Sequence, residues 1–97
     1  MAKGYWVARV DISDEAAYGR YRELNAIAFR KYGAKFLVRG PAGKVVKGTP
    51  RKHNVVLEFM DYETALACYE SAEYQAAKVF LDQVGDIDLV IVPGFED

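Results

Sequence analysis

The stretch that decides the fold runs from Asn54 to Val84 and reads NVVLEFMDYETALACYESAEYQAAKVFLDQV. Its opening residues alternate between apolar and mostly polar side chains, and the apolar set on one side is Val55, Leu57 and Phe59. Alternation with a period of two is typical of a strand with one buried face. The sequence therefore predicts a strand over residues 54–60.

The second half of this stretch has helical spacing. Asp61 provides an N-cap, because its carboxylate can accept hydrogen bonds from the first free backbone N–H groups. Ser71 provides a second N-cap, followed by residues with high helix propensity. The pattern predicts a helical region over residues 62–83 that is broken near Glu70 and Ser71.

The remaining elements are predicted from the same two periods. Polar and glycine-containing stretches separate them, the longest being the connection over residues 41–53, in which Val45 and Val46 are candidates for a short extra strand pairing. We predict strands over residues 4–12, 34–39 and 88–93, and an amphipathic helix that is capped by Ser13 or Asp14 and ends before Gly33.

The order strand, helix, strand, strand, helix, strand predicts one α+β domain over residues 1–97 with a ferredoxin-like βαββαβ fold. Both helices should cover one face of an antiparallel sheet. The other face would expose apolar side chains, namely Val7, Leu37, Val56, Val90 and Val92. A second copy should cover that face, so the sequence predicts a homodimer with an isologous interface through the sheet.

Composition excludes several classes of function. The net charge is −1, with 13 basic and 14 acidic side chains, so nothing favours a nucleic-acid partner. The one cysteine, Cys68, lies in an apolar helical pattern and is predicted to be a buried hydrophobic residue. Neither a signal peptide nor an apolar run of about 20 residues is present, which predicts a cytoplasmic protein that does not enter a membrane.

Four blocks of the chain resemble the small bacterial family known as domain of unknown function 1330. They are residues 4–10 (GYWVARV), 32–40 (YGAKFLVRG), 56–59 (VLEF) and 67–78 (ACYESAEYQAAK). The resemblance implies a dimeric α/β barrel, in which the sheets of two ferredoxin-like protomers join with their helices outside. The wider superfamily includes cofactor-free monooxygenases, isomerases and haem enzymes, so the fold alone does not assign an activity.

Two positions depart from the pattern of that family. Pro41 stands where a second glycine often follows Arg-Gly, and Leu81 stands where a basic residue is common. An anion site that depends on this basic residue would be missing here.

Glu58 is the most informative single residue, because it is a carboxylate within an apolar strand. With a strand order of 4-1-3-2, it should share its face with Arg9, on a first strand taken as parallel, and with Lys35 or Arg39 on the second strand. Lys35 is the expected direct neighbour, and Arg39 should lie nearer to Asn54. One interpretation is a paired ion cluster that is purely structural. The other makes Glu58 a general base, with Arg9 or Arg39 anchoring a carboxylate or enolate.

Further candidate residues are aromatic or titratable. Tyr18, Tyr21 and Tyr74 are candidates for lining a pocket and donating hydrogen bonds, or for completing the core. His53 is expected in a polar loop exposed to solvent, with a role as acid–base partner as the minor alternative. A single histidine and a single cysteine in separate segments do not form a metal site, so no metal or other cofactor is predicted.

These observations leave three functions open. The first is binding of a small organic molecule in a pocket of the sheet by a dimer that has no chemistry of its own. The second is a cofactor-independent isomerase or monooxygenase-like enzyme that uses Glu58 as its base. The third is a purely structural dimer whose charges are buried and paired.

Overall fold

The structure is a computed structural model that describes residues 2–41, 43–49 and 51–96. The predicted order of elements is confirmed, with the second helical region divided in two. The elements are β1 (Gly4–Ile12), α1 (Glu15–Lys31), β2 (Lys35–Pro41), β3 (His53–Phe59), α2 (Tyr62–Glu70), α3 (Ala72–Leu81) and β4 (Gly85–Pro93).

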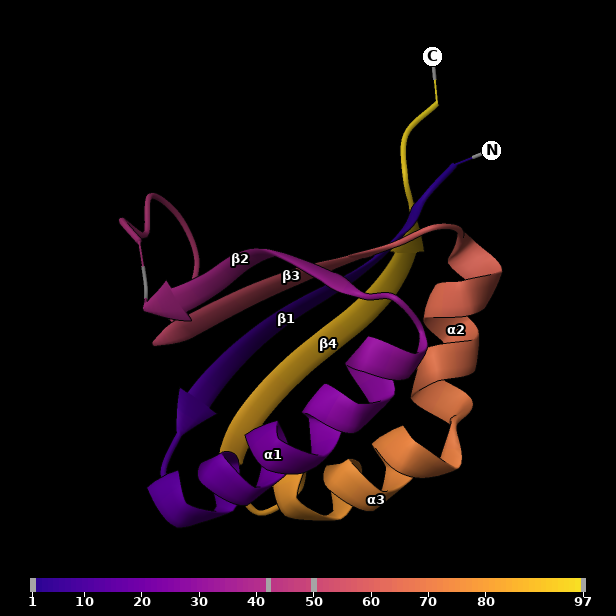
Figure 1. Cartoon of the computed structure of the whole chain (residues 1–97). Coiled ribbons are helices and arrows are strands. Elements are labelled where there is room, and N and C mark those ends of the chain that lie inside the picture. Colours follow the sequence, from indigo (N-terminus) through magenta and orange to yellow (C-terminus); the bar gives the residue numbers. More distant parts are fainter. Residues whose placement is uncertain (1, 42, 50, 97) are drawn as a thin grey trace.

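The four strands form one antiparallel sheet in the order β2-β3-β1-β4, and the helices cover one of its faces (Figure 1). This confirms the predicted α+β, ferredoxin-like arrangement. The opposite face carries no helix, and we call it the bare face. The connection between β2 and β3 and both chain ends project on the side of the bare face (Figure 1).

The prediction that β1 runs parallel to β3 is wrong. The crossover through α1 makes β1 and β2 parallel, and the direct connection from β2 to β3 reverses the chain, so β3 is antiparallel to β1. As a result, Tyr5 lies opposite Glu58, while Arg9 lies opposite Asn54. Arg9 and Glu58 share the bare face but are four residues apart along the strands.

A β-bulge in β2 changes which side chains of that strand face the helices. Lys35 pairs with Glu58 as predicted, but the register shifts between Phe36 and Val38. Val38 rather than Leu37 then lies opposite Val56 on the bare face, and Arg39 lies opposite Val55 on the face that the helices cover. The prediction that Arg39 shares the face of Glu58 is therefore wrong.

The core lies between the sheet and the helices and is centred on Trp6. The Trp6 ring makes edge-on contacts with Phe29 and Tyr74, with centroid distances of 5.3 and 4.8 Å. Its indole Nε1 donates a hydrogen bond of 2.9 Å to the carbonyl oxygen of Ala65 in α2. One aromatic side chain thus joins β1 to all three helices.

The helix starts follow the predicted caps. The carboxylates of Asp14 and Asp61 accept hydrogen bonds from the backbone N–H groups of Ala17 and Thr64, at 3.0 and 2.7 Å. The Ser71 hydroxyl accepts from the N–H of Tyr74, which starts α3. By contrast, residues 43–49 contain no strand, so the suggested pairing of Val45 and Val46 is wrong.

Candidate functional site

A partly open cavity lies between α1 and the covered face of the sheet. Its walls are mainly apolar and include Trp6, Phe29, Phe36, Val55, Leu57 and Leu89. The cavity has a volume of about 40 Å³. Because a cavity needs at least roughly 10–15 Å³ to hold one water molecule, this space admits a small chemical group. A larger ligand would leave the rest of its atoms at the rim.

The rim of the cavity carries two arginines from different elements. Arg22 of α1 and Arg39 of β2 both line the cavity and are both exposed to solvent. The guanidinium carbon of Arg39 lies 4.5 Å from the Phe36 ring centroid, and that of Arg22 lies 5.8 Å from the Tyr18 ring centroid. Each guanidinium group is therefore positioned by an aromatic ring next to the opening.

No acidic side chain neutralises these two arginines. Within residues 2–41, 43–49 and 51–96, neither Arg22 nor Arg39 has a carboxylate oxygen within 4.0 Å. The residues that line the cavity also include no aspartate and no glutamate. An anion that enters this opening meets two positive charges and no competing negative charge.

Two tyrosine hydroxyls are hydrogen-bonded to each other at the inner wall of the cavity, where Tyr21 lines the wall and Tyr74 lies behind it. The hydroxyl oxygens of Tyr21 and Tyr74 are 2.9 Å apart, and Asn25 is a further polar residue that lines the cavity. Burial raises the pKa of Tyr21 to about 12, and burial also raises the pKa of Tyr74. Both hydroxyls are protonated at neutral pH and can act as donors.

His53 does not lie in a polar loop, as the sequence suggested. It is the first residue of β3, it is half-buried, and its ring centroid lies 5.8 Å from that of Tyr18. This contact brings His53 next to Tyr18, which lines the cavity. Its predicted role as an acid–base partner stays a prediction.

Glu58 lies on the bare face, on the other side of the sheet from the cavity. Its carboxylate accepts hydrogen bonds from the Tyr5 hydroxyl at 3.0 Å and from Lys3 Nζ at 3.3 Å, with Lys35 opposite it on β2. The hydrogen bond from Tyr5, aided by Lys3, lowers the pKa of Glu58. A carboxylate that is held ionised in this way is a weaker base than an ordinary one.

The predicted site residues therefore divide into two groups. Tyr18, Tyr21 and Arg39 line the cavity on the helix-covered face, with Tyr74 hydrogen-bonded behind them. Glu58, Lys35 and Arg9 lie on the bare face, where Arg9 donates a hydrogen bond of 2.7 Å to the carbonyl oxygen of Thr49. Among the described residues, Glu58 does not line the cavity beside Arg39 or either of the two hollows beside Arg9.

Three residues that contribute to the candidate site or to the fold were not predicted from the sequence. Two of them, Arg22 and Asn25, line the cavity. Asn25 could have been recognised, because it is an amide on the otherwise apolar stripe of the predicted helix. Arg51 lies in the stretch predicted as a polar connection, but its guanidinium contacts Asp11 at 3.1 Å and Asp88 at 3.0 Å. These ion pairs attach the connection between β2 and β3 to the sheet.

Other candidate sites have no support. Cys68 is buried as predicted, and burial raises the pKa of its thiol to about 12, so it is not a nucleophile at neutral pH. Among the described residues, no group of three or more His, Cys, Asp or Glu side chains is arranged to hold a metal ion. In the same part of the chain, no helix combines the length and the apolar character that crossing a membrane requires.

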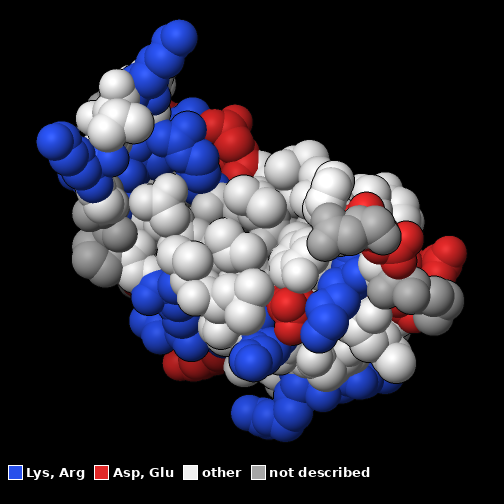
Figure 2. All heavy atoms as spheres, turned by 90° about the horizontal axis from the view of Figure 1, so that it is seen from above, with Lys and Arg blue, Asp and Glu red and all other residues white. Residues whose placement is uncertain are grey.

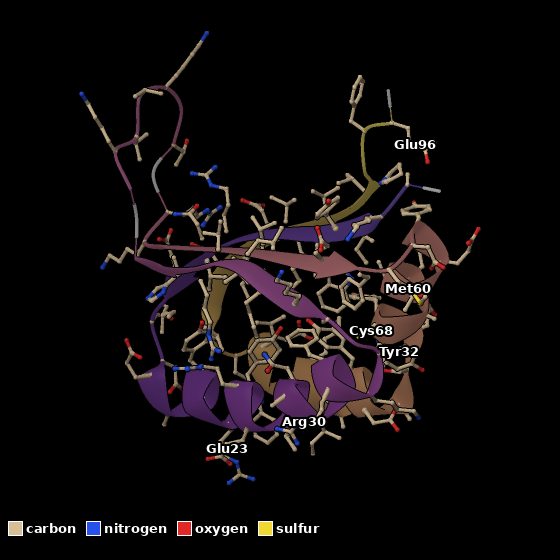
Figure 3. The ribbon with its side chains drawn as sticks, turned by 45° about the horizontal axis from the view of Figure 1, so that its top comes forward. Glu23, Arg30, Tyr32, Met60, Cys68 and Glu96 are labelled. Atoms are coloured by element: carbon tan, nitrogen blue, oxygen red, sulfur yellow. The ribbon has the colours of Figure 1, made fainter. Side chains whose placement is uncertain are left out.

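The bare face carries an apolar row across all four strands. Val38, Val56, Val7 and Val90 are paired in this order, and we call them the central row. Figure 2 shows this face, with uncharged groups in its middle and charged side chains on either side. Figure 3 shows side chains on both sides of the strands, with those on the helical side filling the layer between the sheet and the helices.

A family model described as a domain of unknown function (DUF1330) matches residues 3–95. A search of the curated proteins finds no match. Among solved structures, a protein of unknown function from Rhodopseudomonas palustris has a TM-score of 0.75 at 16% identity, covering 99% of this chain and 85% of that one.

Two further solved structures show the same fold. A dimeric protein of unknown function from Bacteroides fragilis, described as having a ferredoxin-like fold, has a TM-score of 0.61 at 12% identity and covers 94% of this chain and 95% of its own. A candidate antibiotic biosynthesis monooxygenase from Nitrosomonas europaea has a TM-score of 0.60 at 17% identity, and the match covers 97% of this chain and 90% of that one. At these identities the similarity shows the fold and does not assign an activity.

Proposed function

Since the chain belongs to the DUF1330 family, whose description assigns no activity, we propose from the geometry of its cavity that it binds a small monocarboxylic acid. The carboxylate lies at the rim, beside Arg22 and Arg39. The apolar part of the acid enters the space between α1 and the sheet.

One observation carries this proposal: two guanidinium groups without a carboxylate partner stand at the opening of an apolar cavity. A ligand with a single anionic end and an apolar body satisfies both features. Arginine suits this role because its planar fork of N–H donors matches the geometry of a carboxylate. The cavity volume of about 40 Å³ favours short acids over large ones.

We expect Arg39→Met to weaken the binding of short monocarboxylates by about 10- to 100-fold, since a hydrogen bond to a charged group contributes roughly 1.5–3 kcal/mol. Methionine keeps an apolar contact for Phe36 and removes only the charge and the donors. Binding of butanoate, pentanoate, hexanoate and benzoate can be measured by isothermal titration calorimetry. Trp6 provides a second readout, because it lines the cavity and is the one tryptophan of the chain.

The matched control is Arg20→Met. Arg20 also lies over an aromatic ring, with its guanidinium carbon 5.2 Å from the Phe80 centroid, but it does not line the cavity. The proposal requires Arg20→Met to bind the acids like the wild type, and the corresponding primary amides to bind weakly to every variant. Equal effects of the two substitutions, or amides that bind as well as acids, would contradict it.

The second candidate function is a cofactor-independent enzyme that uses Glu58 as its base. It is favoured by the similarity in fold to the candidate monooxygenase and by the Tyr5 hydroxyl beside the carboxylate. In the same titrations, Glu58→Gln is expected to leave acid binding unchanged, because Glu58 lies on the bare face. Loss of binding in Glu58→Gln would move the ligand site to Glu58 and favour this candidate.

We further propose that two copies pair through the bare face to form a homodimer. The central row supports this, because four valines in line would otherwise be left in water. The dimeric description of the Bacteroides fragilis protein also supports it. In such a dimer the two cavities stay on the outer, helical sides and bind independently.

A further inference from the structure

Burial determines which hydroxyl is the donor in the hydrogen bond between Tyr21 and Tyr74. Tyr74 is completely buried, and its hydroxyl has one hydrogen-bond partner among the described residues, the Tyr21 hydroxyl at 2.9 Å. If Tyr21 were the donor, the hydroxyl hydrogen of Tyr74 would be left in the apolar interior without an acceptor. Such an unsatisfied donor is costly, so Tyr74 donates and Tyr21 accepts.

With Tyr74 as the donor, the Tyr21 oxygen is the acceptor of the hydrogen bond between the two hydroxyls. Among the described residues, the Tyr21 hydroxyl has no hydrogen-bond partner other than Tyr74. The hydrogen of Tyr21 therefore has no acceptor within the described part of the chain.

Tyr21 lines the cavity, whereas the fully buried Tyr74 does not. We propose that the hydroxyl hydrogen of Tyr21 is directed at an oxygen atom at the inner end of the bound ligand. This inference rests on the proposed function and narrows it from monocarboxylic acids to those with a second, acceptor oxygen, such as a keto group. Arg39 would hold the carboxylate at the rim, and Tyr21 would select the other end.

The small volume of the cavity, about 40 Å³, favours a short separation between the two oxygen functions of the ligand. Short acids with a keto group at the fourth or fifth carbon are therefore suitable probes. Within the described part of the chain, no aspartate or glutamate lines the cavity and could compete for the hydroxyl hydrogen. A hydroxyl whose own oxygen already accepts a hydrogen bond, as that of Tyr21 does, is a stronger donor, because hydrogen bonds in a chain polarise one another.

The experiment compares matched acids on matched variants. Pentanoate with 4-oxopentanoate, and hexanoate with 5-oxohexanoate, are titrated by calorimetry into the wild type, Tyr21→Phe and Tyr74→Phe. For at least one pair, the preference for the keto acid over its parent is expected to fall by about three- to tenfold in Tyr21→Phe, with the affinity for the parent acid retained. In Tyr74→Phe the preference is expected to persist, because Tyr21 still has its hydrogen.

Each alternative outcome is distinct. An unchanged keto preference in Tyr21→Phe for both pairs would overturn the inference and leave acid binding standing. A preference that arises only in Tyr74→Phe would also overturn it, since Tyr21 would then have been donating to Tyr74. Failure of all four acids to bind the wild type would overturn the proposed function and this inference together. Circular dichroism confirms that each variant is folded before titration.

Discussion

Replacing Val90 with lysine is expected to convert a protein of twice 10.9 kDa into one of 10.9 kDa. Val90 ends the central row on β4 and has 51% of its surface exposed in a single copy, so the substitution costs the folded protomer little. In a dimer that pairs through the bare face, the two-fold axis brings in two ammonium groups without partners. Burying each of them costs several kcal/mol, which weakens association by a factor on the order of 1,000 or more.

Sedimentation equilibrium over a range of protein concentrations measures this change. The control is Val79→Lys, because Val79 is 58% exposed on α3, on the helical side of the molecule. Val79→Lys should sediment like the wild type, and both variants should keep the circular dichroism spectrum of the folded protein. A dimer that survives Val90→Lys would show that the bare face is not the interface.

The elements of the fold were predictable because their signals are local. The first strand was predicted over residues 4–12 and is observed there, since its apolar and mixed faces alternate without interruption. The break between α2 and α3 was predictable because Ser71 has the chemistry of an N-cap, and its hydroxyl accepts from the N–H of Tyr74. These features depend on a few consecutive residues and not on the rest of the chain.

Strand direction and register depend on contacts between segments that are distant in sequence. The predictions of these two features were less accurate than the predictions of the single elements. The error of a parallel β1–β3 pair placed Arg9 beside Glu58, whereas the observed neighbour of Glu58 on β1 is Tyr5. The bulge in β2 had no sequence signal, because Phe36, Leu37 and Val38 are all apolar and fit either face. One additional residue was enough to move Arg39 from the bare face to the cavity.

In the candidate site, too, features with a local signal were predicted and features that depend on strand pairing were not. Tyr18 and Tyr21 were identified as possible pocket residues from their position on the apolar stripe of α1, and both line the cavity. The separation of Glu58 from the cavity could not be predicted, because the wrong strand direction had placed Arg9 beside Glu58 and the missed bulge had placed Arg39 on the same face. A carboxylate within an apolar strand indicated burial and pairing, which Lys3 and Tyr5 provide, more reliably than it indicated a pocket.

The second large effect concerns the junction at which β1, α1 and β4 meet. The Val84 carbonyl oxygen accepts hydrogen bonds from the backbone N–H groups of Ser13 and Asp14, at 2.7 and 3.1 Å, and from the Ser13 hydroxyl at 3.0 Å. Gly85 follows with a φ of +152°, a conformation that side chains with a Cβ rarely adopt. This junction fixes the start of α1, which forms one wall of the cavity.

Gly85→Ala is expected to reduce the free energy of unfolding by about 3 kcal/mol or more. The backbone conformation alone costs roughly 1–3 kcal/mol for a residue with a side chain. In addition, the new Cβ would collide with the Asp11 carbonyl oxygen and lie 3.1 Å from the Ser13 nitrogen, both of them backbone atoms that cannot rotate away. Relief of the collision requires the strand ends to separate, and the hydrogen bonds to Val84 are then lost. Urea denaturation at a fixed protein concentration measures the change.

Alanine substitutions at two other glycines distinguish the cost of the backbone conformation from the cost of the steric collision. Gly33 has a φ of +70° with open space around it, so Gly33→Ala should cost only the conformational part, about 1–2 kcal/mol. Gly19 lies inside α1 with no atom near its missing side chain, so Gly19→Ala should stabilise the protein by up to about 1 kcal/mol. If Gly85→Ala reduces the free energy of unfolding by no more than Gly33→Ala does, the backbone at the junction can shift at little cost to make room for the new Cβ. The start of α1 would then be too mobile to hold Arg22 and Tyr21 in fixed positions around a ligand.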